Sequence, residues 1–529
     1  MQAVRTQLHL LWKPIDRRLD RLGMYRVVTI ALSALAVCAL GFGAIGLVPY
    51  SVPEQAISLI LALATALGAN YAFARGFGVH ANHESAVITA LILHFLVLPA
   101  MVSDIADHRF IILTILAAIA SKYLITVRKQ HILNPAAAGA AIVFLYYEFA
   151  PIDGFFEPLW WAGTPALFIP LLFLGALVVT KVRRWGMVLS FLGVGFAVSL
   201  IEGWRFAMST DAATFSLLTE TTRFWLSGPS VFLAAFMLTE PFTTPPTQRL
   251  RWGYGGVVGV LSQTTLLSGF VPMTPSIALL IGNAAFFPFS LRRKLFLTFR
   301  EKREVAAATW EFLFAKPDGV RFKPGQYLEW MLPHEGSDSR GERRYFTIAS
   351  APSEEHIRLV VRFVENGSSY KERLKQLRPG EQIIASQLAG DFLLPDNPHE
   401  KLGFIAGGIG VTPYLSHLEH LRHVGDQRDV HLYYCNNTTA DIAYEAFFRQ
   451  VSGAMPLKLI NVIAKEAVAP PYERGFIDAT MLERHTPDFR ERIWYLSGPP
   501  PMVNAYHTLL REQGIPEHRI VRDFFPGLA

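Results

Sequence analysis

Cysteine is almost absent from this chain: 529 residues contain only Cys38 and Cys435. Cys38 lies inside an apolar stretch, and Cys435 is far away beside a predicted strand. A disulfide framework or an iron–sulfur cluster needs more thiols, closely spaced. The chain therefore cannot hold either of them by itself.

Charge is also scarce, because only 17% of residues are charged while 51% are hydrophobic. Charged residues are sparse to about residue 290 and frequent afterwards, so the chain joins two different kinds of polypeptide. This composition is too apolar for a purely soluble enzyme. Basic residues that flank membrane helices explain the net charge of +6, and no basic run with interleaved aromatics suggests nucleic acid as a partner.

The first half contains apolar runs of spanning or near-spanning length, which predict a polytopic membrane domain of about ten helices over 26–291. A polar, basic segment over 1–25 precedes it and does not have the features of a cleavable signal peptide. The predicted runs are 27–49, 55–74, 85–102, 109–127, 132–150, 160–180, 186–202, 229–241, 254–271 and 274–290.

Lysine and arginine are concentrated in alternate loops of this half, and the other loops are poor in both. The positive-inside rule assigns the basic loops to the cytoplasm. An even number of helices then returns the chain to the cytoplasm at about residue 291. The sequence therefore predicts an integral protein of the cell inner membrane with its second half on the cytoplasmic side.

The second half has the pattern of two soluble domains. Residues 296–398 contain short β-type runs such as "WEFLFA" and "IRLVVRFV" between glycine and proline turns, which predicts a small antiparallel β-barrel. Residues 399–529 alternate apolar strands, such as "LGFIA" and "VHLYYC", with helix-like segments. This pattern predicts an α/β domain with a parallel sheet.

Five motifs follow one another in this half: "RYFTIAS", "ENGSSYKERL", "AGDFLLP", "IAGGIGVTPYLSHL" and "LSGPPPMV". Together they resemble the ferredoxin-NADP reductase family. The resemblance implies an FAD-binding barrel, an NAD(P)H-binding domain and an NAD(P)H-dependent, FAD-containing oxidoreductase.

The first two motifs are expected to bind FAD. The planar fork of Arg344 fits the oxygens of the flavin pyrophosphate, Phe346 is expected to pack on the flavin, and the Thr347 hydroxyl lies near N5, where the hydride arrives. Alternatively, Phe346 is a core aromatic and Ser369 only caps a helix. The predicted FAD-binding residues are Arg344, Tyr345, Phe346, Thr347, Ser350, Gly367, Ser368 and Ser369.

The later motifs are expected to bind NAD(P)H, because a glycine-rich loop directly after a strand lets a dinucleotide approach the backbone. The segment "CNNTTADIAY" offers no arginine for a 2′-phosphate, which favours NADH. The predicted residues are Gly407, Gly408, Gly410, Thr412, Pro413, Gly498, Pro499, Pro500 and Met502.

Three residues are expected to act in hydride transfer: Thr347, Ser497 and Phe525. Ser497 stands where the family commonly has cysteine, and its hydroxyl can still pack near the nicotinamide, with slower hydride transfer expected. Phe525, with Phe524 as its rival, is the candidate for the aromatic that covers the flavin ring in many relatives.

The membrane half has a resemblance of its own, carried by "ESAVITALILHFLVLP", "KYLITVRKQHILNPAAAG" and "FMLTEPFTTPPTQRLRWGYGGVVGVL". These segments resemble the D subunit of the Rnf electron-transport complex and the B subunit of the sodium-pumping NADH:quinone reductase, with Glu240 where the family usually has Asp. The resemblance implies FMN on a threonine, and Thr164 in "WWAGTPAL" is the candidate. Because this segment departs from the family's attachment sequence, covalent FMN, non-covalent flavin and loss of the site all stay open.

Three alternatives are open for the whole chain. A haem-containing, ferric-reductase-like protein would use His80 and His94, but a second helix with a matching pair is absent, and His131 belongs to the "HILNPAA" pattern. A redox-driven ion pump component would need intramembrane acids, and Glu84, Asp104 and Glu240 lie near predicted helix ends. A vestigial reductase on a scaffold conflicts with motifs that are intact apart from Ser497.

The sequence thus predicts a membrane-bound flavoprotein that passes electrons from NAD(P)H via FAD to a membrane-domain flavin and then to a quinone or an outward acceptor. The expected partners are the lipid bilayer and a quinone or a partner redox subunit, and no metal site is expected. A flavin at Thr164 would lie about 30 Å of hydrocarbon from the cytoplasmic face. Electron transfer would then need a second cofactor midway, a quinone that enters from the side, or a partner subunit.

Overall fold

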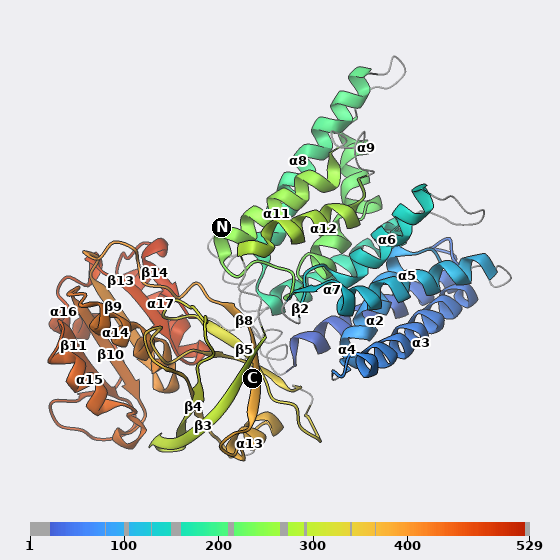
Figure 1. Ribbon diagram of the computed structural model, residues 1–529. Helices are drawn as coiled ribbons and strands as arrows, with labels where there is room; N and C mark the ends of the chain where they lie inside the picture. The colour runs from blue at the N-terminus through green and yellow to red at the C-terminus, as the bar shows by residue number, and fades with distance from the viewer. Residues whose placement is uncertain are drawn as a thin grey trace. The chain divides into compact units, whose positions relative to one another are not determined.

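The computed structural model divides the chain into two compact units, the first ending at Lys294 and the second beginning at Leu295. Helices make up almost all of the first unit, here called the helical unit, and the second, the reductase unit, contains both large sheets (Figure 1). The structure describes residues 22–79, 81–99, 105–127, 130–149, 160–209, 216–264, 273–289, 294–338, 341–365 and 367–523.

The helical unit has a described helix in each of the ten apolar runs. Among the described residues, four helical stretches are long and apolar enough to cross a membrane: Met24–Ala44, Val52–Gly76, Pro165–Val182 and Trp185–Ser209. The number of crossings therefore stays a prediction. The main helices are α2 (Met24–Ala44), α3 (Val52–Gly76), α4 (His83–Leu96), α5 (Ile105–Leu124), α6 (Pro135–Phe149), α7 (Phe168–Val182), α8 (Trp185–Ser209), α11 (Gln248–Gln263) and α12 (Pro275–Phe286).

Shorter elements connect these helices. Trp161–Gly163 (η1) and Pro165–Leu167 (η2) lead into α7, a two-stranded hairpin precedes α6, and a wider helical turn at Leu233–Met237 follows α10. The remaining short elements are β1 (Thr126–Val127), β2 (Gln130–His131), α9 (Leu217–Thr222), η3 (Arg223–Ser227), α10 (Ser230–Phe232), η4 (Leu233–Met237) and η5 (Phe287–Phe289).

Small residues set how closely these helices pack. On α11, a Cβ at Gly259 would stand 2.7 Å from the Phe191 carbonyl oxygen of α8. On α6, a Cβ at Gly139 would stand 2.6 Å from the Ala118 Cβ of α5. Glycine removes that obstruction, so the paired backbones approach closely, as is common between helices in a bilayer.

The first domain of the reductase unit is a six-stranded, fully antiparallel sheet in the order β6-β5-β8-β3-β4-β7. Its core contains Phe299, Phe312, Phe314 and Trp330. The antiparallel prediction is confirmed, while closure into a barrel stays a prediction. The elements are β3 (Leu295–Ala306), β4 (Thr309–Ala315), β5 (Tyr327–Met331), β6 (Arg343–Thr347), β7 (His356–Arg362), α13 (Ser369–Lys375) and β8 (Gln382–Ala389).

The second domain is a six-stranded parallel sheet in the order β12-β11-β10-β9-β13-β14, which confirms the predicted parallel α/β fold. All six residues of β9 are buried, as in a central parallel strand. The strand order reverses between β9 and β13, and ligands of such sheets bind at the carboxyl ends beside this point. The strands are β9 (Leu402–Gly407), β10 (Val430–Asn436), β11 (Leu457–Ile463), β12 (Glu473–Arg474), β13 (Ile493–Ser497) and β14 (Ile520–Arg522), and the main helices are α14 (Thr412–Val424), α15 (Glu445–Ser452), α16 (Ala479–His485) and α17 (Pro500–Glu512).

Buried polar contacts join these two domains. The Tyr444 hydroxyl donates to Glu311 at 2.7 Å, and Glu311 is also paired with Arg303 at 2.7 Å and Arg358 at 3.3 Å. Ser416 on α14 donates to the carbonyl oxygen of Ser350 at 2.7 Å. These contacts fix the parallel sheet against the antiparallel one, so that the motifs of both domains keep a defined geometry.

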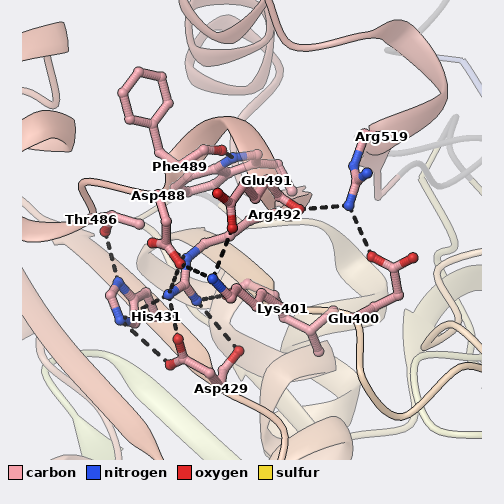
Figure 2. Close-up of polar contacts among 12 residues, drawn as sticks. Glu400, Lys401, Asp429, His431, Thr486, Asp488, Phe489, Glu491, Arg492 and Arg519 are labelled. Atoms are coloured by element: carbon pink, nitrogen blue, oxygen red, sulfur yellow. Dashed lines mark hydrogen bonds and ion pairs between the residues drawn. The ribbon is translucent and has the colours of Figure 1, made fainter.

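A polar cluster lies at the opposite, amino end of the parallel strands (Figure 2). Arg492, which directly precedes β13, is 1% exposed and donates to Asp488 at 2.9 Å and to Asp429 at 2.5 Å. Its guanidinium also lies 3.3 Å from Nε2 of His431, whose Nδ1 lies 2.8 Å from the Thr486 hydroxyl. Because the cluster sits away from the carboxyl ends of the strands, we assign it to stability.

We expect the reductase unit to be sensitive to acid, because of His431 in this cluster and of His417, a buried histidine on α14. Burial, and for His431 also the nearby Arg492 charge, lowers the pKa of His417 and of His431 to about 4. An unfolded histidine has a pKa of about 6.5, so between about pH 6.5 and 4 the unfolded state binds more protons. We expect the free energy of unfolding to fall over this range, with His417 alone contributing on the order of 3 kcal/mol.

Thermal unfolding of the detergent-solubilised chain between pH 7.5 and 4.5 tests this expectation. His431→Gln removes one titrating ring and should flatten the pH dependence. His423→Gln, at an exposed position, should leave it unchanged. If the melting temperature depends equally on pH in all three proteins, His431 does not change its protonation on unfolding.

Candidate functional site

Strand β6 presents Arg344 and Phe346 on one face and Arg343 and Tyr345 on the other. The Arg344 guanidinium lies 5.1 Å from the ring centroid of Tyr370, and the Phe346 ring lies 6.1 Å from the same ring. The predicted FAD-binding residues Arg344 and Phe346 therefore both lie beside Tyr370 and form what is here called the flavin clamp.

The predicted site residue Tyr345 faces elsewhere. Its hydroxyl donates to Glu329 at 3.2 Å, and Glu329 also pairs with Arg343 at 3.0 Å. Tyr345 thus shares a face with a buried carboxylate and lies on the face opposite to Arg344.

Thr347 ends β6 and is 4% exposed. Its buried hydroxyl has no hydrogen-bond partner among the residues that the structure describes. Ser350, by contrast, has a structural task, because its hydroxyl accepts from the Arg358 amide at 3.2 Å. A buried hydroxyl without a partner costs free energy unless a ligand supplies one.

The second FAD motif leads into α13. Ser368 caps this helix by accepting from the Lys371 amide at 3.3 Å, and Gly367 precedes it. Ser369 is the first residue of the helix, and its amide donates to Asp338 at 3.1 Å. Asp338 also lies 3.7 Å from the Arg344 guanidinium, so two segments predicted to hold the flavin phosphates converge.

These residues fit FAD. A cation that is 5% exposed, a neighbouring backbone amide that already binds a carboxylate, and a buried hydroxyl without a partner form a suitable set of donors. Arg344 and Ser369 would hold the pyrophosphate, and Phe346 and Thr347 would contact the flavin ring system. Burial also raises the pKa of the Tyr370 hydroxyl, which keeps this neighbour of Arg344 neutral.

The predicted nucleotide motifs meet at the carboxyl ends of β9 and β13. A Cβ at Gly410 would stand 2.5 Å from the Ser497 carbonyl oxygen and 2.6 Å from Gly498. A Cβ at Gly407 would stand 3.0 Å from Pro499 and would also crowd Met502. Two of the three predicted glycines thus let the two loops pack on each other.

The remaining residues of these motifs shape the loop ends. Gly408 has a φ of +50°, a left-handed conformation that favours glycine. Thr412 and Pro413 begin α14, and Pro500 begins α17 after Pro499. Both motifs therefore turn directly from strand into helix.

Ser497 is the last residue of β13 and is 2% exposed. Its hydroxyl donates to the Asp523 carboxylate at 2.8 Å. Phe525 and its rival Phe524 lie outside the described residues. The sequence analysis did not single out Asp523, although it directly precedes the two phenylalanines.

A cation beside the glycine-rich loop was also missed. Arg362, at the end of β7, pairs with Asp441 at 2.8 Å and lies 3.8 Å from the Cβ position of Gly408. Asp441 follows β10 in the segment that favoured NADH, and it is held by the amide of Thr438 at 3.1 Å. No linear motif joins Arg362 and Asp441, because they belong to different domains.

In the helical unit, Thr164 lies between η1 and η2. Its hydroxyl donates to the Trp161 carbonyl oxygen at 2.6 Å. The Trp161 indole in turn donates to the carbonyl oxygen of His94 at 2.5 Å, and its ring lies 5.3 Å from the buried His94 ring. Thr164 and His94, predicted for different cofactors, thus flank one aromatic residue.

The predicted haem pair is incompletely described. His80 lies outside the described residues, and within the described ranges no group of three or more His, Cys, Asp and Glu side chains could hold a metal ion. His94 packs edge-on against Phe95 with ring centroids 5.2 Å apart. The buried His94 ring therefore packs among aromatic side chains, as a core residue does.

Polar residues also join the breaks in the helices. The Glu240 carboxylate lies 3.2 Å from Nε2 of His131 and accepts a hydrogen bond from the Thr243 hydroxyl at 3.2 Å. Of the other two acids, Glu84 lies 4.0 Å from Arg26, and Asp104 lies outside the described residues. These contacts bring together the "HILNPAA" and "TEPFTTPPT" segments.

A further polar chain begins at Asn134, the residue before α6. Its backbone amide donates to the side-chain oxygen of Asn283 at 2.8 Å, and the Asn283 side-chain nitrogen donates to the Tyr254 hydroxyl at 2.7 Å. All three residues are buried. An asparagine inside the apolar run "IGNAAF" was the signal that could have identified Asn283.

Comparison with known protein families gives one match in the helical unit and one in the reductase unit. Residues 160–289 match the model described as the NQR2, RnfD, RnfE family, and residues 404–508 match the oxidoreductase NAD-binding domain. The domain architecture implies FAD and NAD(P)H as cofactors.

Individual relatives match part of the chain. The chain is 30% identical over 221 residues to the reductase component of propane 2-monooxygenase from Rhodococcus jostii, covering 40% of this chain and 58% of that protein. It is 26% identical over 248 residues to a flavohemoprotein from Rhodopirellula baltica, covering 44% and 60%. Among solved structures, the Amycolatopsis cytochrome P450 reductase GcoB matches at 26% identity with a TM-score of 0.39, covering 44% and 69%. The chain thus spans about three fifths of the curated relatives that it matches. One chain therefore carries a region of the NQR2, RnfD, RnfE family together with a ferredoxin-reductase-like oxidoreductase domain that binds NAD.

Proposed function

We propose that this protein is a membrane-bound NAD(P)H-oxidising flavoprotein. Electrons would pass from NAD(P)H via FAD to a flavin in the helical unit and then to a quinone or an outward acceptor. The observation that carries the proposal is the presence, in one chain, of an NAD-binding oxidoreductase domain and a region of a membrane electron-transport family. The basic loops of the sequence support an inner-membrane location with the reductase unit in the cytoplasm.

In this proposal, bound FAD supplies hydride acceptance and release of single electrons. Arg344 and Ser369 would hold its pyrophosphate, while Phe346 and Thr347 would position the ring. The paired loops at Gly410 and Ser497 would hold the nicotinamide, and the Asp523 carboxylate accepts from the Ser497 hydroxyl at 2.8 Å and so fixes its orientation. NADH is the proposed electron donor, because the segment "CNNTTADIAY" offers no arginine for a 2′-phosphate.

Thr164 is the position that we propose for the membrane-side flavin, in a membrane domain for which we propose about ten helices. Its hydroxyl already donates to Trp161 at 2.6 Å, so an ester at this oxygen would have to replace that hydrogen bond. FMN bound there without a covalent bond would leave the contact intact. The two arrangements differ in whether the flavin stays attached to the chain after denaturation.

The test is an anaerobic absorbance spectrum of the detergent-purified protein before and after addition of NADH or NADPH, followed by denaturation to count released and retained flavin. Flavin bands that bleach, with more than one flavin per chain, are the expected result. Flavin retained after denaturation identifies covalent attachment, and its loss in Thr164→Val locates the bond. A Soret band that shifts on reduction would contradict the proposal and favour the haem alternative.

A redox-driven ion pump component is the second candidate. It is favoured by the paired His131 and Glu240 side chains at the helix break, which are 17% and 20% exposed. Ionisable groups in a membrane domain commonly mark an ion pathway. Ion uptake by proteoliposomes that depends on NADH oxidation would support this candidate, and oxidation without uptake would exclude it.

A further inference from the structure

The described part of the loop before β6, residues 332–338, contacts the residues predicted to hold the FAD pyrophosphate. Asp338 makes three contacts there. Its carboxylate accepts from the Ser369 amide at 3.1 Å and lies 3.7 Å from the Arg344 guanidinium, while its own amide donates to the Ser369 hydroxyl at 2.9 Å. The Asp338 carboxylate therefore faces both segments that are predicted to bind phosphate, with a hydrogen bond to Ser369 and an ion pair to Arg344.

His334 holds the same loop at a second point. Its Nε2 lies 2.9 Å from the Ser369 hydroxyl, and its Nδ1 lies 2.8 Å from the Leu332 carbonyl oxygen. The His334 amide also donates to Glu342 at 3.2 Å. The loop is thus tied to Ser369 through both His334 and Asp338.

The chemistry of these contacts matches that of a phosphate. A carboxylate and a phosphate oxygen are both anionic acceptors for a guanidinium and a backbone amide. Arg344 is 5% exposed and is covered on one side by Tyr370 at 5.1 Å, so few directions remain from which a second anion can approach it. The Asp338 carboxylate and a pyrophosphate would also repel each other.

We infer that Asp338 is an internal competitor of the flavin pyrophosphate: its carboxylate and the pyrophosphate compete for Arg344 and the Ser369 amide, so Asp338 leaves when FAD binds. This inference rests on the proposed function, because it assumes that Arg344 and Ser369 bind FAD. The loop then sets both the affinity for FAD and its rate of release.

The expected size follows from population shift. If FAD binds only when the Asp338 contacts are open, its apparent dissociation constant is the intrinsic constant divided by the open fraction. An ion pair of this exposure lowers the open fraction by about fivefold. Asp338→Asn keeps the side-chain shape and one acceptor oxygen but removes the charge, so we expect it to bind FAD about fivefold more tightly.

The test is a titration with FAD of the flavin-stripped, full-length protein in detergent, in which quenching of flavin fluorescence reports binding. The rate of FAD release after dilution is measured as well. Glu335→Gln is the matched control, because Glu335 is an exposed acid of the same loop. Asp338→Ala is a second variant that should act in the same direction. We expect tighter binding in both Asp338 variants and no change in the control.

Other results overturn the inference. Weaker FAD binding in both Asp338 variants would show that Asp338 positions Arg344 for the flavin, and equal binding in all four proteins would show that Asp338 does not compete. Tighter binding in Glu335→Gln as well would assign the effect to the general charge of the loop. If the wild-type protein binds no FAD, the proposed function itself fails, and this is seen before any variant is compared.

Discussion

Replacing Arg344 with alanine is expected to weaken FAD binding strongly while the fold is retained. Arg344 is the cation at which β6, α13 and the loop before β6 meet, and hydrogen bonds from a guanidinium to phosphate are among the strong ones in proteins. Loss of such a buried, charged contact costs about 2–5 kcal/mol of binding free energy. We therefore expect FAD affinity to fall by about 30-fold to more than 1,000-fold. The measurement is the FAD content of the purified variant, followed by titration.

The fold should survive this change, because the hydrophobic core of the antiparallel sheet is formed by other residues, such as Phe312 and Trp330, and not by Arg344. Arg344→Lys retains the charge without the fork and should bind FAD with intermediate affinity. The control is Arg321→Ala, an exposed arginine in the same domain. Unchanged flavin content in Arg344→Ala would contradict the assigned clamp.

The second large effect is expected from Gly410→Ala. The new Cβ would stand 2.5 Å from the Ser497 carbonyl oxygen and 2.6 Å from Gly498, and both atoms belong to backbone that cannot rotate away. The loops after β9 and β13 must then separate. Forcing extra volume into a packed site costs about 1–3 kcal/mol, and a displacement of about 1 Å lowers reaction rates by about 100-fold. We expect FAD to remain bound and its reduction by NADH to slow by about this factor.

Stopped-flow reduction of the bound flavin, under anaerobic conditions and at several NADH concentrations, measures this effect. Gly453→Ala is the matched control: its φ is −80° and the nearest atom to its Cβ position is 3.5 Å away, so an alanine fits. Normal flavin reduction in Gly410→Ala would mean that nicotinamide does not bind between these loops. Loss of FAD as well would show that the change disturbs more than the nucleotide domain.

Much of the architecture was predictable because it depends on local patterns. The buried run "LGFIAG" became the central parallel strand β9, and the glycine and proline motifs that follow β9 and β13 turned directly into helices. The ten apolar runs each contain a described helix. Apolar length alone did not fix the number of membrane crossings, since four of the described helices meet the length and hydropathy that spanning requires.

The site was predicted in part. Arg344, Phe346 and Ser369 converge because i and i+2 of a strand share a face and α13 packs beside it. The same alternation places Tyr345 on the opposite face, with Glu329. The alternation of side chains along a strand therefore predicted which face each residue of β6 lies on, but it did not predict the contact partners on that face.

What the sequence alone determined is the division into an apolar helical half and a reductase half, together with the motifs predicted to bind FAD and NAD(P)H, because hydrophobic runs and turn residues act over short distances along the chain. Only the tertiary structure decided which distant residues meet: Asp338 with Arg344, Arg362 with Asp441, and Asn134 with Asn283. Such pairs depend on strand order, loop packing and burial, and a polar side chain gives no sign in the sequence of the partner that will satisfy it.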